Sequence, residues 1–220
     1  MAEILKGAPV AAALSEELIA RAETLKQAGT VPTLAILRLG ERPDDISYET
    51  GAMKRCDKIG IAVKRFLLPE DCTMDQLLDT VREINGDGSI HGCLMFRPLP
   101  DRAMEDAACA LLAPEKDVDG MTSGSMASVF TGKGAGYPPC TAQACMELLD
   151  HYGVNLTGKR AVVIGRSLVI GKPVSMMLQQ KNATVTMCHT RTVDMPGVCR
   201  EAEVVIAAAG KAGVVDKAFA

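Results

Sequence analysis

Residues 161–174, AVVIGRSLVIGKPV, show the spacing of residue types that most directly indicates chemistry. A hydrophobic run leads into Gly165, and Gly171 follows six residues later. A strand, a glycine turn and the start of a helix in this order form a site for a pyrophosphate, because the turn lets the ligand approach the backbone and the helix offers unpaired N–H groups. Pro173 suits the first turn of that helix. Ser167 stands where the usual fingerprint has its middle glycine, so the spacing alone leaves an ordinary strand-to-helix turn as an alternative.

The polar residues around this turn favour a dinucleotide that carries a 2′-phosphate. A site for the unphosphorylated nicotinamide cofactor usually places an acid about 20 residues further on, at the end of the second strand. Residues 188–192, CHTRT, occupy that position and contain no acid. The hydroxyl of Thr190 and the guanidinium of Arg166 are groups that bind a phosphate. We therefore expect NADP as the cofactor, with a solvated loop arginine as the alternative explanation of Arg166.

Helices and strands that alternate along most of the chain must position these residues. Hydrophobic periodicity predicts helices over 9–28, 45–58, 73–85, 102–112, 141–152, 171–181 and 196–201. It predicts strands over 33–37, 61–68, 92–96, 160–164, 183–188 and 203–209. Such alternation is typical of parallel sheets with helices on their faces, so we expect an α/β fold.

The alternation stops between residues 114 and 139, a stretch rich in Gly, Ser and Pro that we expect to be a loop-rich crossing. The helix at 141–152 then looks like a rod between two lobes. Its apolar face is predicted to carry Ala144, Cys145, Leu148 and Leu149. We expect two α/β lobes, residues 1–140 and 141–220, with a ligand cleft between them.

Composition argues against several classes of protein. The net charge is −3, aromatic residues make up only 3% and Trp is absent, so we expect no nucleic-acid partner. No apolar run reaches the ~18 residues of a membrane span, and the N-terminal stretch is typical of an amphipathic helix, not a signal peptide. The eight cysteines are scattered without a C-x-x-C pair. We interpret them as reduced core residues of a cytoplasmic protein and expect no metal site.

Five motifs in one chain order carry a resemblance to a known family. They are Ser47-Tyr48 followed by Cys56 and Gly60-Ile61, Pro98-Leu99-Pro100, Pro114-Glu115-Lys116-Asp117-Val118-Asp119-Gly120, Pro139-Cys140-Thr141, and Gly165-Arg166-Ser167 followed by Gly171-Lys172-Pro173. With them the chain resembles the methylenetetrahydrofolate dehydrogenase/methenyltetrahydrofolate cyclohydrolase family over essentially its whole length. The resemblance implies a homodimer of two-lobed chains that oxidises 5,10-methylenetetrahydrofolate with NADP. Many members then hydrolyse the methenyl product to 10-formyltetrahydrofolate.

The resemblance also implies roles for the domains and for single residues. Residues 1–140 would be the folate-binding catalytic domain, and 141–220 an incomplete Rossmann-like NADP-binding domain. Tyr48 would stack along the folate and Asp119 would hydrogen-bond the pterin ring. Without the resemblance, Tyr48 is a half-buried helix residue and the acids of the K-D-V-D-G block are turn residues, a reading that stays open for Asp117. The implied substrate-binding set is Tyr48, Asp119, Pro100 and Thr141. The implied cofactor-binding set is Gly165, Arg166, Ser167, Gly171, Pro173 and Thr190.

Two positions depart from the family pattern in a way that bears on mechanism. Ala52 stands where the pattern has a lysine, four residues after Tyr48 and so on the same helix face. Phe96 stands where the pattern has a glutamine that would touch that lysine. Lys54 lies roughly 120° around the helix from Tyr48 and does not replace the missing amine. Arg97 could supply charge, but an arginine cannot serve as a base.

These departures predict unequal effects on the two reactions. A positioned acid or base is worth ~10²–10⁴-fold in a step where water attacks and protons move. Hydride transfer depends more on holding two rings face to face. We therefore expect the dehydrogenase step to survive better than the cyclohydrolase step. A fully bifunctional enzyme, a folate- or NADP-binding protein without turnover, and another Rossmann-like oxidoreductase are the alternatives.

The chain ends at Ala220, whereas the resemblance implies roughly another quarter of length with a further strand, a glycine-rich loop and a closing helix. We expect an incomplete cofactor sheet with an open edge, which is a liability for aggregation.

Overall fold

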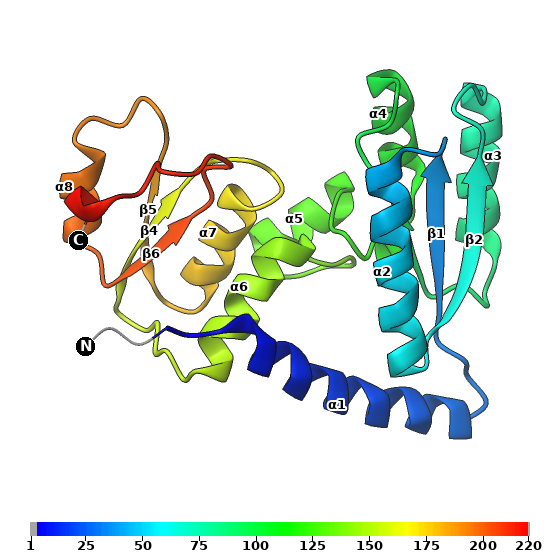
Figure 1. Ribbon diagram of the computed structural model, residues 1–220, viewed down its shortest axis with the longest axis horizontal. Coiled ribbons are helices and arrows are strands. Elements are labelled where there is room, and N and C mark those ends of the chain that lie inside the picture. The colour runs from blue at the N-terminus through cyan, green and yellow to red at the C-terminus, as the bar shows by residue number, and fades with distance from the viewer. Residues whose placement is uncertain (1–3, 220) are drawn as a thin grey trace. The chain divides into compact units, whose positions relative to one another are not determined.

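The computed structural model describes residues 4–219, which divide into two α/β units (Figure 1). The N-terminal unit comprises Lys6–Ser125 together with Ala135–Tyr137. The C-terminal unit is the rest of the described chain. The boundary that the sequence analysis places at residue 140 stays a prediction about domain function.

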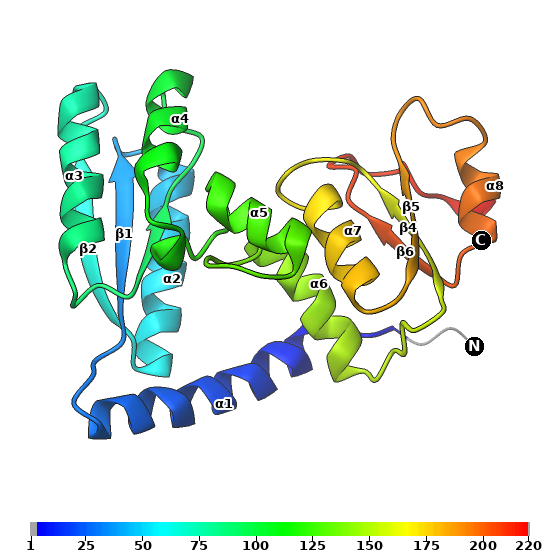
Figure 2. The same cartoon turned by 180° about the vertical axis from the view of Figure 1, so that it is seen from behind.

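The N-terminal unit is built on a parallel sheet in the order β2-β1-β3. Its elements are α1 (Gly7–Gln27), β1 (Thr33–Leu39), α2 (Pro43–Ile59), β2 (Ala62–Leu68), α3 (Met74–Gly86), β3 (Gly92–Met95), α4 (Arg102–Leu111) and the 3₁₀ turn η1 (Pro114–Lys116). The central strand β1 pairs along all seven of its residues with β2 and is buried over its last five. Helix α2 covers one face of the sheet, and α3 and α4 cover the other (Figures 1 and 2).

The two faces of β1 explain this layering. Ala35, Leu37 and Leu39 share a buried cluster with residues of α3 and α4. Arg38 points to the opposite face, where its Nε lies 2.7 Å from Glu49 Oε2 of α2. Both side chains of this ion pair are 5% exposed, so a buried charge pair ties α2 to the sheet.

The C-terminal unit is built on a second parallel sheet, in the order β5-β4-β6. Its elements are α6 (Cys140–His151), β4 (Arg160–Ile164), α7 (Gly171–Gln180), β5 (Thr184–Cys188), α8 (Met195–Arg200), β6 (Val204–Ala207) and the 3₁₀ turn η2 (Lys217–Phe219). Ala161 and Val163 of β4 pack with α6 and α7 on one face. Val162 and Ile164 form a smaller cluster with Cys188 and Cys199 on the other.

Parallel strands require crossover connections, which here are helices. Side-chain caps at their N-termini help to start two of these helices. Thr73 caps α3: its hydroxyl accepts the N–H of Gln76, and the Gln76 side chain accepts the N–H of Thr73. Asp101 caps α4 by accepting the N–H of Ala103. Such caps satisfy N–H groups that have no partner inside the helix.

The expectation of a loop-rich crossing over 114–139 is wrong in part, because α5 (Ser123–Thr131) lies within it. The hydroxyl of Thr122 accepts the N–H of Ser125, a capping bond that starts the helix despite its low helix propensity. A Cβ at Gly124 would lie 2.4 Å from Cγ of Pro114, so the glycine permits close packing.

The buried face of α6 also differs from the predicted one. Ala142 and Met146 are its buried residues, whereas Ala144 is exposed. Cys145 and Leu149 of the predicted face are partly buried against the same cluster as Ala142 and Met146, so that part of the prediction is confirmed.

Other expectations concern the cysteines, metals and membranes. None of the eight cysteines forms a disulfide, and Cys140 is exposed and therefore not a core residue. Between residues 4 and 219 no cluster of three or more His, Cys, Asp and Glu side chains is arranged to hold a metal ion. No helix in the same range is long and apolar enough to cross a membrane.

Candidate active site

The turn after β4 requires both of its glycines. Gly165 has φ of +123°, and a Cβ there would lie 2.3 Å from the carbonyl oxygen of Ala208. A Cβ at Gly171 would lie 2.1 Å from the carbonyl oxygen of Gly165. The N–H of Gly165 donates to Cys188 O at 2.8 Å, which fixes the turn to the end of β5. The sequence prediction of a tight strand–turn–helix unit is thus confirmed in its geometry.

Ser167 closes this turn from within. Its hydroxyl accepts the N–H groups of Ile170 at 3.1 Å and Gly171 at 3.5 Å, and its carbonyl accepts the N–H of Lys172 at 3.0 Å. Pro173 has no N–H, so the start of α7 does not offer the unpaired donors that the sequence analysis expected. The N–H groups of residues 166–169 donate to no described residue and are the remaining backbone donors of the turn.

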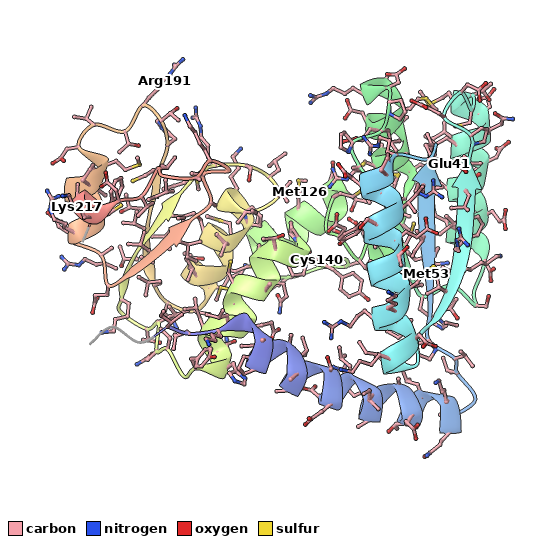
Figure 3. All side chains as sticks on the ribbon, viewed as in Figure 1. Glu41, Met53, Met126, Cys140, Arg191 and Lys217 are labelled. Carbon is pink, nitrogen blue, oxygen red and sulfur yellow. The ribbon has the colours of Figure 1, made fainter. Side chains whose placement is uncertain are left out.

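A second turn follows β5 and presents polar groups to solvent. His189 N–H donates to the Thr192 hydroxyl at 2.9 Å, and Arg191 N–H donates to Nδ1 of His189 at 3.1 Å. Thr190 is exposed at the apex. Arg191 is exposed as well and points away from the ribbon (Figure 3). Arg191 is not among the predicted cofactor-binding residues, although its place in the CHTRT stretch was a signal for it.

An apolar pocket that the sequence analysis missed borders the first turn. It has a volume of about 140 Å³ and is lined by Leu168 and Pro173 together with residues of α5, among them Met126 and Phe130. Phe130 is 74% exposed. The pocket was missed because α5 itself was not predicted.

In the N-terminal unit, α2 places Tyr48 and Ala52 on one face, as their spacing of four residues predicts. Both line an open hollow of about 460 Å³ with Asp44, Ser47 and Gly51. Tyr48 is 62% exposed, more than a half-buried helix residue would be. Among the described residues that line this hollow there is no lysine.

Phe96 supports Tyr48 from the end of β3. The two rings meet edge to face, with centroids 5.3 Å apart and an interplanar angle of 67°. Phe96 is 5% exposed, so its ring is part of the packed unit and Tyr48 rests on it. An aromatic ring at this position offers no hydrogen bond to a neighbouring group.

The two acids of the K-D-V-D-G block have separate roles. Asp117 is fully buried and accepts the N–H groups of Met121 at 3.1 Å and Thr122 at 2.7 Å, so it shapes the turn. The Asp119 side chain is 31% exposed and its Oδ2 lies 3.7 Å from Nη2 of Arg97. Asp119 is therefore the acid of this block that a ligand can reach.

The predicted site residues belong to both units. Tyr48, Asp119 and Pro100 lie in the N-terminal unit. Thr141 lies in the C-terminal unit with the cofactor-binding set. Contacts join Tyr48 to Phe96, the neighbour of Arg97, and Arg97 in turn to Asp119. Pro100 and Thr141 are exposed, and their roles stay predictions.

The comparisons with known proteins decide the family. Residues 5–119 match the family model described as tetrahydrofolate dehydrogenase/cyclohydrolase, catalytic domain. Residues 139–219 match its NAD(P)-binding domain. The chain belongs to the tetrahydrofolate dehydrogenase/cyclohydrolase family.

Relatives within this family support the assignment along the whole chain. A bifunctional protein FolD from Alkaliphilus oremlandii is 47% identical over 219 residues, which are 100% of this chain and 77% of the relative. The crystal structure of FolD from Campylobacter jejuni has a TM-score of 0.94 at 34% identity and covers 99% of this chain and 77% of that one. The Trypanosoma brucei enzyme, solved with NADP and an inhibitor, has a TM-score of 0.88 at 32% identity over 97% of this chain and 74% of that one.

Family membership confirms several expectations at once. The fold has two α/β domains, each with a parallel sheet. The second domain is an NAD(P)-binding domain. The chain is an enzyme of the tetrahydrofolate dehydrogenase/cyclohydrolase family and uses a nicotinamide cofactor.

Proposed function

We propose that this chain oxidises 5,10-methylenetetrahydrofolate to the 5,10-methenyl form with NADP⁺ and hydrolyses the methenyl product only weakly. The lining of the hollow beside Tyr48 carries the proposal. Ala52 and Gly51 are small and uncharged there, and Phe96 packs against Tyr48 where the family pattern has a glutamine. This lining supports a surface on which a folate can stack, with no lysine among the described residues that line the hollow.

The two turns of the C-terminal unit support the choice of NADP. NADP⁺ accepts a hydride in the reaction. The amides of residues 166–169 suit its pyrophosphate, because successive backbone N–H groups in a tight turn bind anions. Arg166, Thr190 and Arg191 are exposed and carry the donors that a 2′-phosphate needs. An acidic residue, which would repel that phosphate, is absent from 188–192.

In the N-terminal unit, the proposed substrate contacts come from α2 and the K-D-V-D-G block. Tyr48 offers a ring face held by Phe96, on which the folate would stack. Asp119 offers a carboxylate, which suits the N–H groups of the pterin ring. Both interactions hold the substrate in place, and hydride transfer gains most from such positioning.

Hydrolysis needs more than positioning. Water must attack the methenyl carbon while a nearby group takes up a proton. A lysine four residues after Tyr48 would place its amine in the hollow. Ala52 occupies that position and has no amine. Without that group the step is expected to lose ~10²–10⁴-fold.

A fully bifunctional enzyme is the second candidate, favoured by the names of relatives such as the bifunctional protein FolD that is 47% identical to this chain. The resemblance also supports a homodimer, which sedimentation would test, and the reduced cysteines suit a cytoplasmic location.

The deciding experiment follows two products separately after mixing the protein with 5,10-methylenetetrahydrofolate and NADP⁺. Absorbance would report NADPH and methenyltetrahydrofolate in one time course. Methenyl product that accumulates with NADPH supports the proposal. NADPH without accumulation shows efficient hydrolysis and supports the second candidate. No NADPH at all, with saturable NADP binding, indicates a binding protein.

A further inference from the structure

We propose that Arg97 is a positioning residue that holds the Asp119 carboxylate toward the folate, and that Glu105 in turn holds Arg97. The inference rests on the proposed role of Asp119 as a pterin-binding residue. Arg97 stands where the family pattern has the first leucine of L-P-L-P.

The guanidinium of Arg97 lies between two carboxylates. Nη1 is 3.6 Å from Glu105 Oε1, and Nη2 is 3.7 Å from Asp119 Oδ2. The three side chains are 25%, 21% and 31% exposed, so water screens these charges less than on an open surface. Both distances exceed a hydrogen bond, and charge attraction is therefore what holds the groups together.

Glu105 is fixed to the backbone on the other side. Its Oε2 accepts the N–H of Leu99 at 2.9 Å, and it lies in the first turn of α4, where the helix dipole favours a negative charge. Arg97 itself lies two residues after the end of β3. The cation is thus anchored to a strand end and a helix start, both of which are rigid elements.

The Arg97 guanidinium is not fully satisfied within the protein. Its Nε is buried, and among residues 4–219 no acceptor lies within hydrogen-bonding distance of it. Buried donors nearly always have a partner, and an exception calls for an explanation. The observed arrangement places the charge beside Asp119, the member of the trio that a ligand can reach.

The consequence for binding is specific. A carboxylate with a fixed cation at one oxygen has a defined orientation, and it can then bind the pterin ring without further ordering. Arg97 cannot take up a proton in the reaction. Its effect is therefore expected in the binding of folate, and much less in the chemical step or in the binding of NADP.

The test compares variants of the full chain by steady-state kinetics and thermal melting. Arg97→Leu removes the positive charge. Arg97→Lys keeps the charge but lacks the planar guanidinium group. Glu105→Gln keeps the acceptor for Leu99 and removes the anchoring charge. Arg102→Leu is the matched control, because Arg102 is 92% exposed and pairs with the exposed Asp106.

We expect Arg97→Leu to raise KM for 5,10-methylenetetrahydrofolate about tenfold or more while kcat and KM for NADP⁺ change by less than about threefold. Arg97→Lys should keep KM for 5,10-methylenetetrahydrofolate close to that of the parent protein. Glu105→Gln should give a KM between those of Arg97→Lys and Arg97→Leu. In an Asp119→Asn background, Arg97→Leu should add nothing, because it acts through the missing carboxylate. The control should match the parent protein.

Two outcomes overturn the inference in distinguishable ways. If Asp119→Asn leaves KM for the folate unchanged, the proposed role of Asp119 fails and the inference fails with it. If Asp119→Asn raises that KM but Arg97→Leu and Arg97→Lys do not, Asp119 binds the folate without help and only the inference fails. Should Arg97→Leu not fold, Arg97→Lys and Glu105→Gln alone decide the question.

Discussion

The ring of Phe96 meets the ring of Tyr48 edge to face at a centroid distance of 5.3 Å. This contact joins the end of β3 to the middle of α2 and fixes the side chain that is proposed to stack on the folate. Tyr48 also lines the hollow that contains Ala52. Positions 52 and 96 are thus both neighbours of Tyr48, one through the hollow and one through the ring contact.

Restoring the polar pair should raise hydrolysis. We expect Ala52→Lys with Phe96→Gln to increase the rate of methenyltetrahydrofolate hydrolysis by ~10²-fold or more, because a positioned amine and a hydrogen-bonding amide return together. The measurement is the disappearance of methenyltetrahydrofolate in the absence of NADP⁺. Ala52→Met with Phe96→Gln is the control of similar size without an amine. Equal rates for the two variants would show that the amine is not what is missing.

Adding a methyl group to the cofactor turn should abolish NADP binding. The Cβ of Gly171→Ala would lie 2.1 Å from the carbonyl oxygen of Gly165, so the turn must open. We expect a loss of about 1–3 kcal/mol in the free energy of unfolding and no saturable NADP binding by calorimetry. Gly86→Ala is the control, because nothing lies within 4 Å of its Cβ. NADP affinity that survives in Gly171→Ala would contradict the assignment of this turn.

The buried ion pair beneath α2 should matter for stability far more than a surface pair. Glu49→Ala leaves Arg38 buried without its partner at 2.7 Å and also removes the contact of Glu49 Oε1 with Arg65 Nε at 2.6 Å. We expect a loss of about 3–5 kcal/mol in the free energy of unfolding, measured by urea denaturation. Glu17→Ala removes an exposed pair with Arg21 and should change it by less than about 1 kcal/mol. Similar losses for both variants would disprove the role of the buried pair.

The cysteines should differ sharply in reactivity. Burial raises the pKa of the Cys93 thiol from 9.0 to about 12, and burial likewise raises that of Cys109 to about 11. A raised thiol pKa stabilises the folded state below pH 9, and that contribution is lost as the pH rises from 9 toward these values. In the native protein at mildly alkaline pH, iodoacetamide should therefore modify the exposed Cys140 first, as seen by mass spectrometry. Early labelling of Cys93 would contradict this order.

Much of the fold follows from local signals in the sequence. The strand that begins at Thr33 and the glycine turn at 165–171 each depend on a few neighbouring residues, and each is found where the sequence predicts it. Helix α5 was missed because its composition favours a loop, and only the Thr122 cap and the packing of Gly124 against Pro114 reveal it.

The parts of the site that escaped prediction depend on residues far apart in the chain. The proximity of Arg97 to Asp119 arises because two separate turns converge, and no spacing rule encodes that distance. The hydrogen bond that the Ser167 hydroxyl accepts from Ile170 N–H depends on the rotamer and the backbone geometry, which a motif does not specify. Residues 52 and 96 were singled out only because a family pattern supplied the comparison.

The hydrogen bonds by which Ser167 closes its turn have a thermodynamic consequence. A loop that internal hydrogen bonds already hold in one shape loses little conformational entropy when a ligand binds to that shape. The loop should therefore bind a dinucleotide without a slow rearrangement. Residues 165–171 should be as well ordered in a crystal without the ligand as with it. Ser167→Gly removes these hydrogen bonds, so the loop would have to become ordered as the ligand binds, and that ordering would weaken binding.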